Sequence, residues 1–173
     1  HPRFAPVVMP PHVYDGGWEF FVGGGIAVFD CDQDSLPDIF IAGGEAPSAL
    51  LRNRSQRGGE VKFTKQTPQD LSLENVTGAY PLDIDGDGFL DLAVLRVGAN
   101  LILQGAAECH FTPFANFKDD YLSGWTTSFS ATWETGQSLP TLAFGNYVDR
   151  NNPEGPFGTC DQNFLYRPNG ANY

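Results

Sequence analysis

Eight aspartates are concentrated in two nine-residue segments of this 173-residue chain, and their spacing is the feature best suited to chemistry. They occupy positions 1, 3, 5 and 9 of each segment: Asp30, Asp32, Asp34 and Asp38, then Asp83, Asp85, Asp87 and Asp91. Carboxylates this close repel one another unless a cation lies among them, and Ca²⁺ suits the position because it accepts six to eight oxygen ligands in a flexible geometry. The backbone carbonyl at position 7, from Leu36 or Phe89, would add a ligand, and Gly86 and Gly88 permit the backbone angles of such a turn. The spacing therefore predicts two calcium sites.

An EF-hand is the main alternative, because its calcium loop begins with the same alternation of aspartates. An EF-hand also requires a glutamate at position 12 and a helix on each side. Position 12 is Ile41 in the first loop and Val94 in the second, and the flanking residues are apolar in the manner of β-strands. Mg²⁺ fits less well, since it requires rigid octahedral geometry and keeps several waters. The pattern favours calcium in a turn between two strands, closed by Asp38 or Asp91 at the start of the outgoing strand.

The two loops belong to a longer internal repeat. Residues 25–38 align with residues 78–91, and the offset between Asp30 and Asp83 is 53 residues. A third, eroded copy follows 51 residues after Asp83, where Glu134 stands in place of the first aspartate. This copy keeps one carboxylate in its loop and is one residue shorter. We expect it to hold its turn without a metal.

Each repeat contains about four short segments with the character of β-strands, and residues 50–53, 101–104 and 164–167 align as one of them. The 20 glycines, 13 prolines and 14 phenylalanines, without sustained helical periodicity, favour short strands joined by turns. A unit of about fifty residues with four strands is typical of a propeller blade, which must stack on neighbours to bury both faces. We predict an all-β fold of about three propeller-type blades, a partial or incomplete propeller, since closed rings typically have about four to eight. The predicted boundaries are an extended N-terminal arm over 1–22 and repeats over 23–173, divided as 23–75, 76–127 and 128–173.

An apolar strand, Asp-x-Asp-x-Asp-Gly-x-x-Asp and a second apolar strand together resemble the FG-GAP (VCBS-type) repeats of integrin α-chain propellers. Residues 23–32 and 142–150 are also similar to secreted bacterial proteins related to cartilage acidic protein, which usually carry an additional ASPIC/UnbV region. The resemblance covers about residues 20–170. It implies a β-propeller, calcium between the first two strands of a blade, and an extracellular or periplasmic location. The first loop departs from the family pattern, since Gln33 and Ser35 stand where glycines are usual.

Charge and composition argue against several other classes. The net charge of −11 argues against a nucleic-acid partner, because phosphate binding needs a basic surface. No apolar run approaches the roughly 20 residues of a membrane-spanning helix. The histidines at positions 1, 12 and 110 are scattered without a partner at motif spacing, so we expect no catalytic site. A start at His1 fits a mature secreted product or a piece of a longer chain.

The cysteines and two sequence triplets bear on secretion. Three cysteines, Cys31, Cys109 and Cys160, permit one disulfide and one free thiol, or a pairing outside this chain. A Cys31–Cys160 or a Cys109–Cys160 bridge is compatible with the sequence, which does not choose a pairing. Asn-x-Ser/Thr triplets at Asn53 and Asn75 are candidate glycosylation sites.

These features together predict a calcium-binding extracellular structural or interaction module rather than an enzyme, acting in adhesion, filament building or as an accessory subunit. The expected partner is another protein or further copies of the chain. One alternative is a carbohydrate-binding module that uses the propeller face, on which Trp18, Trp125 and Trp133 with the many Phe and Tyr residues would form the sugar-binding surface, although we expect these aromatic residues to pack between blades. Another is a fragment of a secreted hydrolase whose catalytic residues lie elsewhere.

Overall fold

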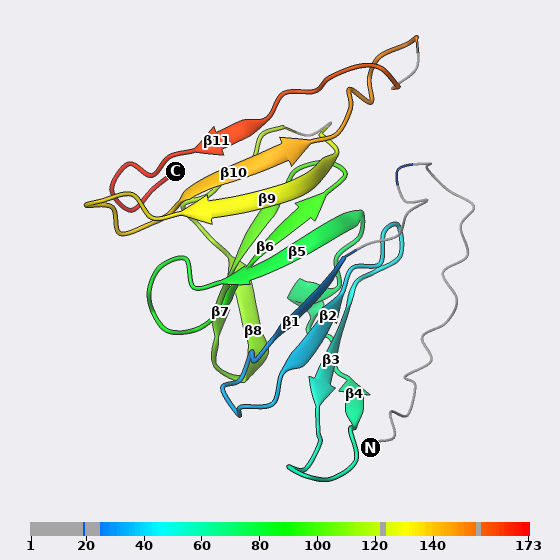
Figure 1. Cartoon of the computed structure of the whole chain (residues 1–173), viewed down its shortest axis with the longest axis vertical. Coiled ribbons are helices and arrows are strands. Elements are labelled where there is room, and N and C mark those ends of the chain that lie inside the picture. The colour runs from blue at the N-terminus through cyan, green and yellow to red at the C-terminus, as the bar shows by residue number, and fades with distance from the viewer. Residues whose placement is uncertain (1–18, 20–24, 122–123, 155–156) are drawn as a thin grey trace.

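Three antiparallel β-sheets follow one another along the chain (Figure 1). The computed structural model describes residues 19, 25–121, 124–154 and 157–173. The first sheet contains β1 (Ile26–Phe29), β2 (Asp38–Ile41), β3 (Ala49–Asn53) and β4 (Phe63–Lys65). The second contains β5 (Val76–Leu82), β6 (Asp91–Arg96), β7 (Leu101–Ala106) and β8 (His110–Pro113), and the third contains β9 (Thr126–Thr132), β10 (Thr141–Asn146) and β11 (Phe164–Tyr166).

Within each sheet the strands are ordered as they occur in the sequence, so that every strand pairs with the next one along the chain. Such meanders need only short turns between antiparallel neighbours. Short 3₁₀ helices lie outside the strands, among them η2 (Gln69–Leu71) before β5 and η3 (Ala107–Cys109) between β7 and β8. In the described part of the chain, no helix has the length and hydropathy needed to cross a bilayer.

The second sheet is buried on both faces, and the alternation of side chains in β6 explains how. Leu92 and Val94 belong to a core shared with the first sheet, where Phe40 is fully buried. Ala93 and Leu95 belong to a second core shared with the third sheet. Successive side chains of a strand point to opposite faces, so an uninterrupted apolar strand is what a sheet between two others requires.

The first and third sheets each have an outward face with exposed apolar side chains. In β1, Ala27 and Phe29 are buried, whereas Ile26 and Val28 are 65% and 57% exposed. In β11, Leu165 is 66% exposed. A blade in the middle of a stack buries such positions against a neighbour. Among the described residues, these two faces have no neighbouring sheet.

The leading strands of the sheets lie next to one another, β1 beside β5 and β5 beside β9. The first approach is close because two glycines meet there: a Cβ on Gly25 would lie 3.1 Å from the Cα of Gly78. At the second approach, the Thr77 hydroxyl donates a 2.5 Å hydrogen bond to the Thr126 carbonyl. The strands that lead each repeat therefore gather on one side of the stack, as in a propeller.

The predicted all-β fold of propeller-type blades is confirmed, with one correction. The third repeat was expected to have about four strands like the others, but its described residues form three. Among the described residues, no strand pairing joins the third sheet back to the first. The N-terminal arm predicted over 1–22 lies outside the described residues except for Glu19, whose carboxylate pairs with Arg150 at 2.6 Å.

Candidate metal centre

Both aspartate loops connect the first two strands of their sheet. The first loop lies between β1 and β2, and the second lies between β5 and β6. In each case the ninth residue is the first residue of the outgoing strand, as predicted: Asp38 begins β2 and Asp91 begins β6. The strand register therefore presents the ninth carboxylate directly beneath the turn that carries the others.

The second loop is folded by its own carboxylates. Asp83 accepts hydrogen bonds from the backbone N–H groups of Gly86 (2.8 Å) and Gly88 (3.1 Å), and Asp87 accepts one from Phe89 (2.8 Å). Both glycines have positive φ, 77° and 90°. Asx-type bonds of this kind are the usual means by which Asp forms a tight turn.

Asp91 is fully buried and ties the second loop to its sheet. Its two oxygens accept hydrogen bonds from the backbone N–H groups of Ile84 (2.7 Å) and Gly105 (2.8 Å). Burial raises the pKa of Asp91 to about 6, and the nearby charges of Asp85 and Asp87 act in the same direction, while the two N–H donors oppose the shift. A cation beside this carboxylate would favour its charged form.

The first loop contains an equivalent buried carboxylate. Asp38 is 1% exposed and accepts hydrogen bonds from the backbone N–H groups of Asn53 (2.7 Å) and Cys31 (3.4 Å). Burial raises its pKa, while those two N–H groups and the positive charge of Arg52 act against the rise. Asp38 and Asp91 therefore join their turns to their sheets through equivalent backbone hydrogen bonds. Of these two carboxylates, only Asp38 has a cationic side chain, Arg52, beside it.

Three carboxylates converge in each loop. One oxygen from each member of a triad lies within 4.8 Å of the others, and the triads are Asp30, Asp32 and Asp38, and Asp83, Asp85 and Asp91. Positions 1, 3 and 9 are therefore brought together as predicted. Asp34 and Asp87, at position 5, are not members of these groups. They, with the carbonyls of Leu36 and Phe89, remain predicted ligands.

The turn of the first loop has left-handed backbone at the same two positions as the second, but without glycines there. Gln33 and Ser35 have φ of 60° and 67°, at the positions that Gly86 and Gly88 occupy in the second loop. Non-glycine residues in this region are strained by about 1–2 kcal/mol each. The first loop is held in this shape by Asp30, which accepts backbone N–H bonds from Asp34 (3.1 Å) and Ser35 (2.8 Å).

In each of the first two sheets, a side chain from the third strand reaches the aspartate at position 3 of the loop. In the first sheet Arg52 forms an ion pair with Asp32. In the second sheet Gln104 donates a 2.5 Å hydrogen bond from its amide to Asp85. Sequence reasoning missed both side chains, since nothing in the local pattern of either strand indicates that they face a loop 19 or 20 residues earlier in the chain.

The third loop satisfies its single carboxylate within the protein. Glu134 accepts a 2.6 Å hydrogen bond from the Thr141 hydroxyl and a 2.9 Å bond from Arg167, and these two bonds lower its pKa. Thr141 begins β10, where the other repeats have Asp38 and Asp91. The one carboxylate of this loop therefore has partners within the protein, and that the third turn holds without a metal stays a prediction.

The disulfide differs from the pairings that the sequence analysis named. Cys31 in the first loop is bonded to Cys109 at the end of η3, with their Cα atoms 4.9 Å apart. Cys160 is a free, exposed thiol. Sequence reasoning considered bridges to Cys160 because spacing alone does not show that the loop after β7 folds back against the first blade. Because both sulfurs are in the disulfide, their proximity to Asp38 does not make a thiolate metal site.

Other predicted residues are placed without forming a second site. Asn53 and Asn75 remain candidate glycosylation positions, and Asn53 already donates a 3.0 Å hydrogen bond to the Pro37 carbonyl. Trp125 is 6% exposed and packs edge to face with Tyr147, as expected of a packing residue, whereas Trp133 is 51% exposed. His110 is exposed on β8, and the other two histidines and Trp18 lie outside the described residues.

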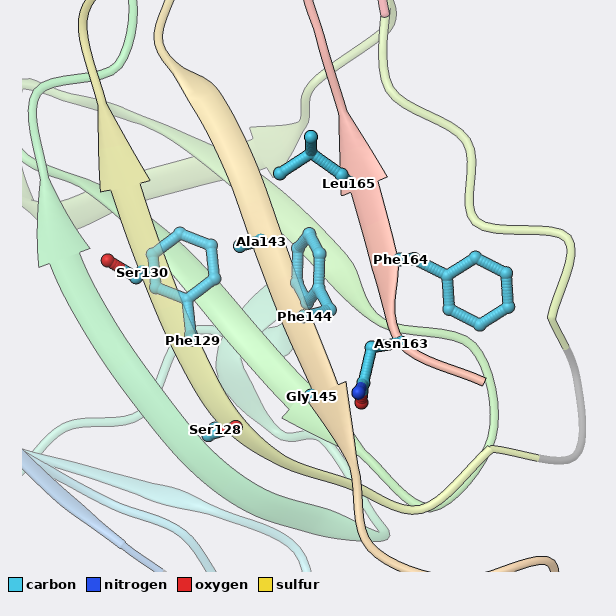
Figure 2. A pocket seen from close by; sticks show the side chains of 9 residues that line it. All are labelled: Ser128, Phe129, Ser130, Ala143, Phe144, Gly145, Asn163, Phe164 and Leu165. Carbon is cyan, nitrogen blue, oxygen red and sulfur yellow. The ribbon is translucent and has the colours of Figure 1, made fainter. Parts of the chain in front are cut away.

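A shallow hollow of about 410 Å³ lies over the third sheet (Figure 2). Its lining comes from all three strands and includes the row formed by Ser130, Ala143 and Leu165, which are neighbours in the strand register. Asn163 supplies an amide at the edge of the hollow. The surface is mostly apolar and is separate from both aspartate triads.

Residues 30–94 match the family model of an FG-GAP-like repeat. The matched span begins at the first aspartate of the first loop and ends within β6, so that it includes both triads. No curated protein matches the chain. The resemblance to FG-GAP repeats that the two aspartate loops indicated is therefore confirmed over this span, which is less than half of the chain.

Proposed function

We propose that this chain is a calcium-binding interaction module that acts outside the cytoplasm and is not an enzyme. The observation that carries the proposal is the convergence of Asp83, Asp85 and Asp91 in a turn between the first two strands of a blade. This turn lies within the span that matches an FG-GAP-like repeat. The finer resemblance to bacterial relatives of cartilage acidic protein belongs to the same proposal.

The chemistry of the second loop fits calcium. Its three converging carboxylates supply hard oxygen ligands, and the oxygens that accept backbone hydrogen bonds keep further lone pairs. Among the described residues, no lysine or arginine forms an ion pair with an aspartate of this loop. Bound Ca²⁺ would neutralise this charge and fix the turn to the start of β6. We expect an affinity on the order of 10⁻⁴ to 10⁻³ M, which is typical of extracellular calcium modules.

The Cys31–Cys109 disulfide supports the proposed location. It joins the first blade to the second and closes a long stretch of chain. Such bonds form and persist in oxidising compartments such as the extracellular space and the periplasm. The exposed apolar outer faces support the interaction role, because Ile26 and Val28 at one end of the stack and Leu165 at the other offer surfaces of the kind that a partner protein or a further copy would cover.

The test is thermal unfolding of the whole chain at pH 7 in excess EDTA and in millimolar calcium, for the parent and for Asp85→Asn. Because calcium binds only the folded loop, it should raise the melting temperature of the parent by several degrees. Most of this rise should be lost in Asp85→Asn. Asp70→Asn, in the exposed 3₁₀ turn η2, removes the same charge outside the loop and should behave as the parent. The proposal fails if calcium leaves the parent unchanged in melting and calorimetry detects no binding.

A further inference from the structure

Each of the three sheets places one residue against its loop, from within its third strand or directly after it, and the strand register identifies these residues. Leu51 pairs with Ile39, Leu103 with Leu92, and Tyr166 with Leu142. The three partners on the second strands are each the residue after Asp38, Asp91 or Thr141. The residues that follow Leu51, Leu103 and Tyr166 are therefore equivalent, and they are Arg52, Gln104 and Arg167. The alignment of residues 50–53 with 101–104, made from sequence alone, differs from this register by one position, because it pairs Arg52 with Leu103 instead of Gln104.

Each of these residues contacts an acidic side chain of its own loop, but their charges differ. Arg52 pairs with Asp32, and Arg167 donates to Glu134. Gln104, between them in the series, is neutral and donates to Asp85. The first and third loops thus receive a positive charge from the protein, whereas the second receives only an amide.

Arg52 lies within the first triad rather than at its edge. The residue is 5% exposed, its Nη2 atom pairs with Asp32, and its Nε atom is 3.4 Å from Oδ1 of Asp38. Two of the three converging carboxylates are therefore in ion-pair contact with the guanidinium. Asp32 Oδ2 is directed to Arg52, and its other oxygen has no hydrogen-bond partner. In the second loop the equivalent Asp85 instead accepts the backbone N–H of Asp87 at 3.2 Å.

We infer that the two aspartate loops are not equivalent calcium sites: Arg52 serves as the cation of the first loop, and calcium binds to the second loop alone. This inference rests on the proposed function for the second loop. A divalent ion in the first triad would lie against a buried guanidinium that cannot lose its proton, and the two like charges would repel in a poorly solvated site. The residues of the first loop therefore do not fit calcium, despite their family pattern.

The division also accounts for the sequence of the first turn. A loop whose carboxylates are already paired with Arg52 keeps its shape without an external ion, although Gln33 and Ser35 strain it. The second loop has two glycines and no cation from the protein, so we expect its shape to depend on whether calcium is bound. One blade is then constitutively ordered, and its neighbour responds to calcium.

Exchange of the two side chains provides the test. Amide resonances of the ¹⁵N-labelled chain are followed by NMR during titration of the chelator-treated protein with CaCl₂, because this measurement locates weak binding residue by residue. Gly86 and Gly88 report on the second loop, and Asp34 and Leu36 report on the first. Gln33 is not used as a reporter, since its side chain contacts the second loop.

In the parent chain, calcium should shift and saturate the resonances of the second-loop reporters. The first-loop reporters should stay unsaturated, because the affinity of the first loop should be at least about tenfold weaker than that of the second. Arg52→Gln copies the second loop and should bring the first-loop reporters to saturation as well, an affinity gain of about tenfold or more. Gln104→Arg should abolish the second-loop response. Arg167→Gln removes the equivalent charge beside a loop with one carboxylate and should bind calcium as the parent does.

Saturation of both loops in the parent at similar calcium concentrations would overturn the inference and leave the proposed function intact. If the parent binds no calcium, the proposed function fails, and the claim that calcium binds the second loop fails with it. Arg52→Gln then decides the claim that Arg52 is the cation of the first loop: a new calcium response in that loop upholds this claim, and no response overturns it. If Arg52→Gln does not fold even with calcium present, Gln104→Arg decides, because a calcium response equal to that of the parent contradicts the claim that an arginine at this position excludes the ion.

Discussion

The side chain of Gln33 in the first aspartate loop donates a 2.8 Å hydrogen bond to the backbone carbonyl of Gly88 in the second. The two loops belong to neighbouring blades and are 55 residues apart in sequence at this contact. Gln33 also occupies a left-handed backbone position, where the second loop has Gly86. A residue that strains its own turn therefore holds the neighbouring turn.

The contact predicts that the first loop supports the second. Gln33→Ala removes the hydrogen bond and keeps a non-glycine residue at the same backbone position, and should weaken calcium binding by the second loop several-fold. The bond is exposed, so the free energy of unfolding without calcium should fall by no more than about 1 kcal/mol. Ser35→Ala, at the other left-handed position of the first loop, is the matched control. Calcium titration of both variants checks the prediction, which is contradicted if they bind equally well.

The Cys31–Cys109 disulfide should be the strongest single restraint between the first two blades. It spans 78 residues of sequence, and closing a loop of this length in the unfolded chain corresponds to about 4.5 kcal/mol in the chain-entropy model. Cys109→Ser should lower the melting temperature strongly, whereas Cys160→Ser, at the free and exposed cysteine, should leave it nearly unchanged. Mass mapping of unreduced proteolytic fragments should recover Cys31 joined to Cys109, and recovery of a fragment joined through Cys160 would refute the pairing.

Packing between the second and third sheets should depend on the inward face of β10. Leu142 is fully buried there among side chains of both sheets. Leu142→Ala should reduce the free energy of unfolding by about 2–5 kcal/mol, because it removes buried contacts and leaves a cavity. Leu165→Ala makes the same chemical change on the outward face of the third sheet, where the side chain is 66% exposed, and should change stability by about 0.5 kcal/mol or less. Denaturant unfolding of the two variants provides the comparison, and equal losses would mean that the outward face is covered.

Gly105 should be intolerant of any side chain. A Cβ built on it would lie 2.2 Å from the carbonyl oxygen of Leu90, and its backbone N–H donates to Asp91. Gly105→Ala must therefore displace either β7 or the start of β6, and should lower the melting temperature and weaken calcium binding together. Gly78→Ala is the control, since its nearest contact would be an ordinary 3.5 Å. Normal calcium affinity in a stable Gly105→Ala protein would show that the hydrogen bond from Gly105 to Asp91 does not position the site.

Local sequence was sufficient to predict most of the strands, the repeat and the aspartate turns, because each of these depends on neighbouring residues. In β1, buried and exposed residues alternate because one face of its sheet is covered. In β6, the apolar run is continuous because both faces of its sheet are covered. Asp83, Asp85 and Asp87 set the second turn through hydrogen bonds to backbone groups only a few residues away. The repeat period then indicated that the first loop shares this design.

The tertiary structure decided which side chain faces each aspartate turn. Arg52 and Gln104 face their loops because of the pairing register between two strands, and a shift of one residue in that register would direct different side chains to the carboxylates. The bond between Cys31 and Cys109 likewise depends on how one blade is seated on the next. Two loops that look alike in sequence thus acquire different charge environments, since electrostatic interactions depend on distance in space rather than on spacing along the chain.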